Sequence, residues 1–321
     1  MLILSLLACD PASSCEQVSN EFCVQGAFDA RGVHADDAGG WLAGTALSEG
    51  RYAPGGWVVG WDEYGDESFA LELDPVTAVT AVTDEGFWVG TETGLALRIL
   101  DGEVVEELTL GADPIRDMIV TDAGLLAVTE TELVLPWGDS WDSSAFEPHE
   151  VAMADGLVLL GGEPKTSFDE VPAGGAAVLA LNDELQVEWV YARPGQLSGL
   201  VVGDEGIFAA GSDEGDLWLE RIADGDRAAG ASWGEVGQEG IHDLALVEGG
   251  LGLSGWTMSA DGVVPWLQWR SVSGGLQGLD ELTEPELSAL PGATSFGPEE
   301  TVLALELGVS EAPATVVIRV D

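Results

Sequence analysis

Seven stretches of the chain share one pattern of apolar and polar positions. Each begins with a four-residue motif (apolar, polar, small or acidic, apolar) and leads to an apolar run bounded by glycine. Successive motifs start 33 to 49 residues apart, at 30–33, 76–79, 115–118, 148–151, 197–200, 241–244 and 287–290. A repeat of this length with several short strands in each unit is typical of a β-propeller.

The unit that begins at Ile241 shows the strands expected in one repeat. Apolar runs separated by turns rich in Gly, Asp and Ser predict strands at 241–247, 251–257, 264–272 and 274–282. The runs are apolar at both odd and even positions, as expected for strands buried on both faces between neighbouring sheets. We therefore predict an all-β fold, a seven-bladed β-propeller of four-stranded antiparallel blades, in a single domain over residues 21–321.

The last unit is one strand short, because the chain ends directly after the apolar run 315–320. Propellers commonly close their ring by taking a missing outer strand from the other terminus, which removes an exposed sheet edge. The run Glu21–Phe28 is strand-like and precedes the first motif. We expect it to complete the seventh blade.

Residues 206–270 carry more specific features of the repeat. A glycine-bounded second strand is followed by an Asp-x-Trp-Leu third strand at 216–219, by an outer-strand Trp233 with Gly-Glu after it, and by an Asp-Gly turn at 261–262. These features resemble the seven-bladed β-propeller repeats of secreted bacterial proteins. The resemblance implies the fold and export from the cytoplasm, and it implies no single activity.

The chain opens with an apolar run that ends at Cys9, and Leu6-Leu7-Ala8-Cys9 resembles a bacterial lipobox. The resemblance implies that residues 1–8 are a lipoprotein-type signal segment, that Cys9 carries diacylglycerol, and that residues 9–20 form a tether. The protein would then be held at either membrane of the bacterial cell envelope, on its extracytoplasmic side, by lipid alone. The alternative is an ordinary buried apolar N-terminus.

All three cysteines lie before residue 24. If Cys9 carries lipid, Cys15 and Cys23 remain, and two cysteines in an exported chain suggest a disulfide. Free thiols and a metal pair are the alternatives, although a metal pair lacks nearby ligands to complete its coordination.

The charge balance is strongly acidic, with 58 Asp and Glu against 10 Lys and Arg, a net charge of −48. Such a field repels phosphate backbones and anionic lipids, so we expect no nucleic-acid partner and no binding to an acidic membrane surface. It favours cations and basic proteins. A solvated acidic surface that only raises solubility explains the same composition.

Rare cations recur at one position of the repeat. The second residue of the motif is Arg31, Arg116, His149 or His242 in four units, and an acid follows in three of them: Asp117, Glu150 and Asp243. In a propeller these residues begin the innermost strands, so we expect a polar ring at the mouth of the central channel, able to hold an anionic or zwitterionic group. Ion pairing between blades is the structural alternative. A zinc site built from the two histidines and an acid has no supporting local spacing.

No nucleophile elbow, Ser-His-Asp order, phosphate loop or dinucleotide motif is present. We expect a monomeric binding or scaffold module without a cofactor, whose partner is an envelope protein or a glycan. The alternative is a hydrolase or lyase acting on a glycan or peptide through the His and acidic residues of the channel mouth. Ser212–Asp216 offers oxygen ligands for calcium but lacks the twelve-residue loop with its closing Glu.

Overall fold

The computed structural model describes residues 22–47, 51–80, 83, 85–136, 138–142, 144–166, 173–234, 239–259, 262–281, 289–296, 301–307 and 314–320. These residues form seven separate four-stranded antiparallel sheets, as the sequence predicts. No helix among them is long and apolar enough to cross a bilayer.

Each sheet is one blade, and its strands follow one another from the inner to the outer edge. Blade 1 holds β2 (Phe28–Asp36), β3 (Gly39–Ala46), β4 (Gly55–Asp62) and β5 (Glu67–Leu73). Blade 2 holds β6 (Val76–Val79), β7 (Phe87–Thr91), β8 (Leu95–Leu100) and β9 (Glu103–Thr109). Blade 3 holds β10 (Ile115–Thr121), β11 (Gly124–Thr129) and two three-residue strands, β12 (Glu132–Val134) and β13 (Ser140–Asp142).

Blade 4 holds β14 (Phe146–Ala154), β15 (Leu157–Pro164), β16 (Ala176–Leu181) and β17 (Val187–Arg193). Blade 5 holds β18 (Gln196–Gly203), β19 (Gly206–Asp213), β20 (Asp216–Ala223) and β21 (Asp226–Trp233). Blade 6 holds β22 (Glu239–Val247), β23 (Gly250–Ser259), β24 (Gly262–Arg270) and β25 (Leu276–Glu281). Blade 7 holds β26 (Ala289–Phe296), β27 (Thr301–Leu307), β28 (Ala314–Val320) and, at its outer edge, β1 (Phe22–Gln25).

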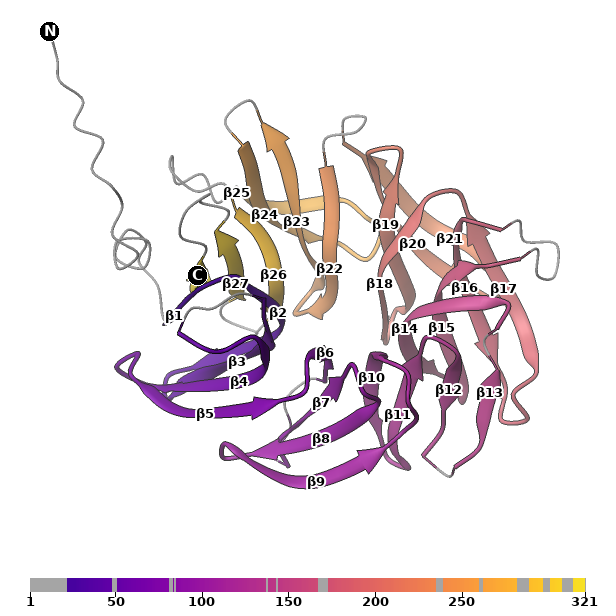
Figure 1. Cartoon of the computed structure of the whole chain (residues 1–321). Coiled ribbons are helices and arrows are strands. Elements are labelled where there is room, and N and C mark those ends of the chain that lie inside the picture. The colour runs from indigo at the N-terminus through magenta and orange to yellow at the C-terminus, as the bar shows by residue number, and fades with distance from the viewer. Residues whose placement is uncertain are drawn as a thin grey trace, which may run out of the picture.

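The innermost strands stand around a common centre (Figure 1). Each of them contacts the innermost strand of the next blade, in the cyclic order β2, β6, β10, β14, β18, β22, β26 and back to β2. Residues that lie far apart in sequence therefore meet at the axis, and the start of each inner strand can contribute a side chain to one shared rim.

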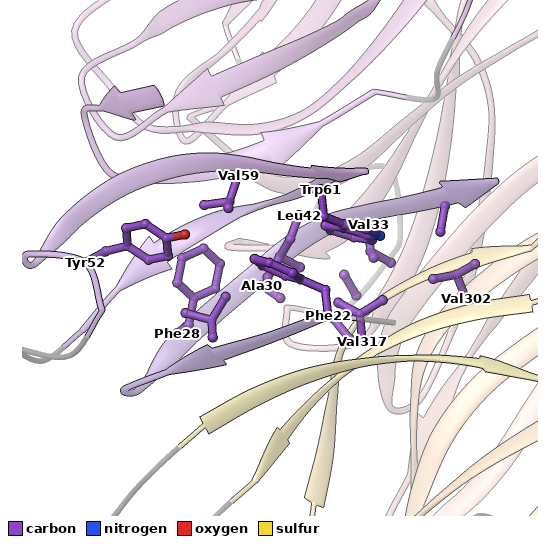
Figure 2. Packing of buried hydrophobic residues seen from close by; sticks show 14 of the residues in the cluster. Phe22, Phe28, Ala30, Val33, Leu42, Tyr52, Val59, Trp61, Val302 and Val317 are labelled. Carbon is purple, nitrogen blue, oxygen red and sulfur yellow. The ribbon is translucent and has the colours of Figure 1, made fainter. Parts of the chain in front are cut away.

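The ring is closed by the N-terminal strand, as predicted. β1 pairs antiparallel with β28, with Phe22 opposite Val317 and Cys23 opposite Val316. The Phe22 ring is buried and stacks on Trp61 of blade 1, with 4.8 Å between the ring centroids (Figure 2). One short strand thus joins blade 7 to blade 1 by both backbone pairing and apolar contact.

Apolar side chains fill the spaces between blades instead of forming a single central core. Seven clusters of buried residues occupy the seven interfaces; between blades 1 and 2, for example, Trp41 stacks on Phe87 with 3.9 Å between centroids. The recurring second-strand glycine belongs to this packing. A Cβ at Gly44 or Gly211 would collide with a carbonyl oxygen of the paired inner strand.

Candidate functional site

A β-bulge occurs at the same position of every inner strand. In all seven blades the pairing with the second strand shifts by one residue between the first and third residues of the motif. The second residue of the motif is therefore the unpaired residue of the bulge: Arg31, Thr77, Arg116, His149, Ser198, His242 and Gly292. A bulge re-aims the side chain it contains, which explains why charged residues gather at this position.

The seventh motif lies four residues later than the sequence pattern predicts. The expected start was Leu287, and Leu287 and Ser288 lie outside the described residues. The bulge of β26 falls between Pro291 and Ala293, so Gly292 is the true counterpart of Arg31 and His242. The bulged segment, Pro291–Thr294, does not fit the apolar-polar-small-apolar pattern, so only the pairing with β27 identifies it.

A cavity of about 870 Å³ opens at this end of the channel. Six of the seven predicted residues line it, namely Arg31, Arg116, Asp117, Glu150, His242 and Asp243. Thr77, Ser198 and Gly292 complete the ring of bulge residues on its wall. His149 does not line the cavity, and its charged surroundings are Glu147, Glu163, Arg116 and Lys165.

The two arginines are paired within their own blades. Arg31 bonds Asp29 of the same strand at 2.5 Å, and Arg116 forms an ion pair with Glu130, which follows β11. Ion pairing between blades, the structural alternative for these residues, is therefore wrong for both arginines. Each guanidinium enters the cavity with part of its charge already balanced.

Both histidines are neutral at physiological pH. Burial, with a smaller effect of the nearby Arg31 charge, lowers the pKa of His242 to about 4, although its accessible atoms still contact the channel cavity. Burial likewise lowers the pKa of His149. The pH-dependent charge of this site is therefore set by its carboxyl groups.

The three acidic residues form the deeper layer of the site. Asp117 accepts backbone N–H bonds from Met118 and, across the blade interface, from Val151, both at 2.7 Å. Asp243 accepts one from Leu244 at 2.7 Å. The carboxyl group of Glu150 makes no hydrogen bond to any described residue. Asp117 and Asp243 thus satisfy inner-strand donors that face the channel, whereas Glu150 has no such structural partner.

Burial changes the acidity of all three groups. It raises the pKa of Asp117 to about 7 and that of Asp243 to about 6, and backbone hydrogen bonds only partly offset the effect. Burial raises the pKa of Glu150 well above its usual range, and the charges of Asp117 and Asp243 add to the rise. The cluster therefore holds protons near neutral pH, and a positive charge placed beside it would displace them.

A second charged cluster, which the sequence pattern did not single out, joins blades 4 and 5. The buried Glu220 of β20 binds Arg193 of β17 at 2.8 Å and Arg227 of β21 at 3.3 Å, and Tyr191 donates its hydroxyl to the same carboxylate. Arg193 also lies over the Trp218 ring, 4.3 Å from its centroid. Every group has a partner, so the cluster fastens two blades together and leaves no open position.

The candidate calcium segment Ser212–Asp216 is a tight hairpin. Asp213 pairs with Asp216 across the turn of Glu214 (φ 50°) and Gly215 (φ 95°), both left-handed as in a two-residue β-hairpin. Across the described part of the chain, no group of three or more His, Cys, Asp or Glu is arranged to hold a metal ion.

Of the three cysteines, only Cys23 belongs to the described residues. It lies in the closing strand β1 and is disulfide-bonded. Cys9, the expected lipidation site, and Cys15, the expected disulfide partner, lie outside the described residues.

No protein-family model matches the chain, and no curated protein matches it. Among solved structures, the chain is similar to the computationally designed Ika8 protein, with a TM-score of 0.56 and 12% sequence identity over 92% of this chain and 99% of that one. A likeness at this identity shows similarity of fold alone.

Proposed function

We propose that this protein is a binding module of the bacterial cell envelope, anchored by lipid at Cys9, whose ligand occupies the polar end of the central channel. The lipobox resemblance of Leu6–Cys9 and the resemblance to repeats of secreted proteins support the location. The proposed tether, residues 9–20, precedes β1 in the sequence, and β1 lies at the outer edge of blade 7.

The observation that carries the proposal is the 870 Å³ cavity, onto which six scattered polar residues converge through one repeated bulge. A cavity of this volume is within the usual range of small-molecule sites. Its arginines are already paired and its deeper groups are carboxyls, so the site favours a ligand with a positively charged group. A zwitterion can also place its anionic group at Arg31 or Arg116.

Isothermal titration with spermidine, L-arginine and citrate tests this assignment. We expect the two positively charged ligands to bind more tightly than citrate, and Glu150→Gln to weaken their binding about tenfold. Glu103→Gln, on the exposed outer strand β9, is the matched control and should leave binding unchanged. Equal binding of all three ligands, or binding unaffected by Glu150→Gln, would contradict the proposal.

Membrane anchorage has an independent test. Cys9→Ala should move the protein from the membrane fraction to the soluble envelope fraction, because its lipid is the proposed anchor. Unchanged fractionation would remove the lipoprotein assignment. For a basic protein partner, co-purification should weaken as salt is raised from 0.05 to about 0.5 M, since screening shortens the reach of the acidic surface.

An enzyme acting on a glycan or peptide is the second candidate, and one observation favours it. The Glu150 carboxyl has a raised pKa and lies near the carboxyl of Asp117, an arrangement that can divide acid and base roles between two carboxyls. Turnover of fluorogenic glycoside or peptide substrates, abolished by Glu150→Gln but not by Glu103→Gln, would establish this role in place of simple binding.

A further inference from the structure

We propose that the opposite, apolar end of the channel and the carboxyl cluster form one continuous site for a small organic cation with an apolar body, such as an alkylamine. The inference rests on the proposed function, because it assigns the chemical class of ligand that the polar cavity takes. It adds a second contact region, which has a different composition and can be tested separately.

A second cavity, of about 850 Å³, lies between the inner strands of blades 3 to 6. Its wall is mainly aliphatic and includes Ile119, Val120, Met153, Val202 and Leu246. Val120 is 49% exposed and Leu246 is 42% exposed, which is unusual for aliphatic residues of innermost strands. The protein therefore presents concave apolar surface to solvent at this end, and burial of that surface would favour binding.

The two cavities share a wall residue on β22, and their linings include residues of the same inner strands. Ala245 lines both of them. On three inner strands the acidic residue is followed after one or two positions by an apolar wall residue, as in Glu150 and Val151 or Asp243 and Leu244. A strand rises about 3.3 Å per residue, so each acidic residue lies one or two residues along its strand from a residue of the apolar wall. A linear ligand can contact both.

Glu150 indicates the charge of the ligand. It lines the polar cavity, is partly buried and makes no hydrogen bond to a described residue, whereas Asp117 and Asp243 accept backbone N–H bonds. An ammonium group supplies both the charge and the hydrogen-bond donors that this carboxyl lacks. Anions are disfavoured here because three carboxyls line the cavity, its two arginines are already paired, and the chain carries a net charge of −48.

Titration calorimetry at pH 8 with hexylamine, octylamine and octanoate tests the proposal on the full chain. Each methylene that enters the apolar cavity should tighten binding about fourfold, so octylamine should bind about fifteenfold more tightly than hexylamine. Octanoate has the same apolar body with the opposite charge and should show no binding. Glu150→Gln should weaken the binding of both amines about equally.

A double variant, Val120→Ser with Leu246→Ser, should remove the chain-length dependence but keep the binding of hexylamine. Leu276→Ser with Leu279→Ser is the matched control, since these residues are 55% and 44% exposed on the outer strand β25. That control should bind octylamine as the native protein does.

Three results would overturn the inference. If hexylamine and octylamine bind equally but depend on Glu150, the ligand stays in the polar cavity and only the proposed function stands. If octanoate binds as tightly as octylamine, the apolar cavity acts alone. If the apolar residues instead mediate self-association, light scattering will show a dimer that Val120→Ser with Leu246→Ser disrupts, and a second copy of the chain is the occupant.

Discussion

Replacement of Asp243 by Asn should stabilise the protein at neutral pH and leave its stability unchanged at pH 4. Asn keeps a side-chain oxygen that can accept the hydrogen bond from the Leu244 N–H, so the local geometry is retained. What disappears is a carboxyl group that must carry its negative charge in a partly buried position once the pH exceeds its pKa of about 6. The same change relieves the charge that Asp243 adds to Asp117 and Glu150.

The sign and size of the stability change follow from the pKa shift of Asp243. The native state raises the pKa of Asp243 from 3.8 to about 6, so between these values it binds more protons than the unfolded chain and its stability falls as pH rises. The shift corresponds to about 3 kcal/mol at 1.36 kcal/mol for each factor of ten. Asp243 is only partly buried, so solvent screens its charge, and we expect a gain of about 1–2 kcal/mol from the variant above pH 7.

Urea unfolding followed by tryptophan fluorescence at pH 4.0, 5.5 and 7.5, at constant ionic strength, measures this gain. Glu103→Gln removes one negative charge from the exposed strand β9 and controls for the general repulsion of an acidic surface. Its effect should stay within about 0.5 kcal/mol at every pH. An Asp243→Asn gain that is the same at pH 4.0 and 7.5, or no larger than that of Glu103→Gln, would refute the reasoning.

Three further predictions concern the closing strand β1, the charged cluster of Glu220 and the disulfide of Cys23. Phe22→Ala should lower the free energy of unfolding by about 3–4 kcal/mol, because the lost ring is 3% exposed and stacked on blade 1. Glu220→Ala should lower the free energy of unfolding by about 3–5 kcal/mol, because Arg193 and Arg227 lose the buried carboxylate that they share. Reduction of the disulfide at Cys23 should lower stability by about 2–4 kcal/mol, since an open chain gains conformational freedom when it unfolds.

Each of these measurements has a comparison within the chain. Val105→Ala, on exposed outer-strand surface, should change the free energy of unfolding by less than about 0.5 kcal/mol. If Phe22→Ala lowers the free energy of unfolding by no more than this control, then β1 does not hold the ring closed. For Glu220, a loss below about 1 kcal/mol would show that the cluster is not a tie between blades. For Cys23, identical unfolding curves with and without reductant would contradict the prediction.

The fold could be predicted because a propeller repeats its pattern along the chain. The motif and its glycine-bounded apolar run recur every 33 to 49 residues, and the missing strand of the last unit points to the N-terminus, where β1 was found. The seventh motif could not be placed, because Leu287–Leu290 fits the apolar-polar-small-apolar pattern whereas the bulged segment, Pro291–Thr294, does not. The choice between them depends on backbone pairing with β27, which composition does not encode.

The sequence predicted which residues line the candidate site better than it predicted their hydrogen bonds and pKa values. A ring architecture brings the motif positions together, so Arg116 and His242 could be assigned to one rim from sequence spacing alone. The hydrogen bond from the Val151 N–H to Asp117 spans 34 residues and depends on how adjacent inner strands are staggered. The acidity of the carboxyls depends on depth in the channel, which no local pattern reports. The second cavity is lined by apolar residues near the ends of inner strands, and these can be told apart from other apolar strand residues only once the ends of the strands are known.

The pairing of β1 with β28 also sets the order of assembly. Residues 22–25 are synthesised near the beginning of the chain and their partners, 314–317, near its end. Six blades can acquire their four strands as the polypeptide emerges, but the seventh must wait for residues 314–320, because β28 lies between β27 and β1 and both strands lack this neighbour until it is made. A copy that lacks residues 314–320 would therefore remain an open arc, with unpaired backbone at the gap. Proteases that recognise unpaired strands would then distinguish open copies from closed rings.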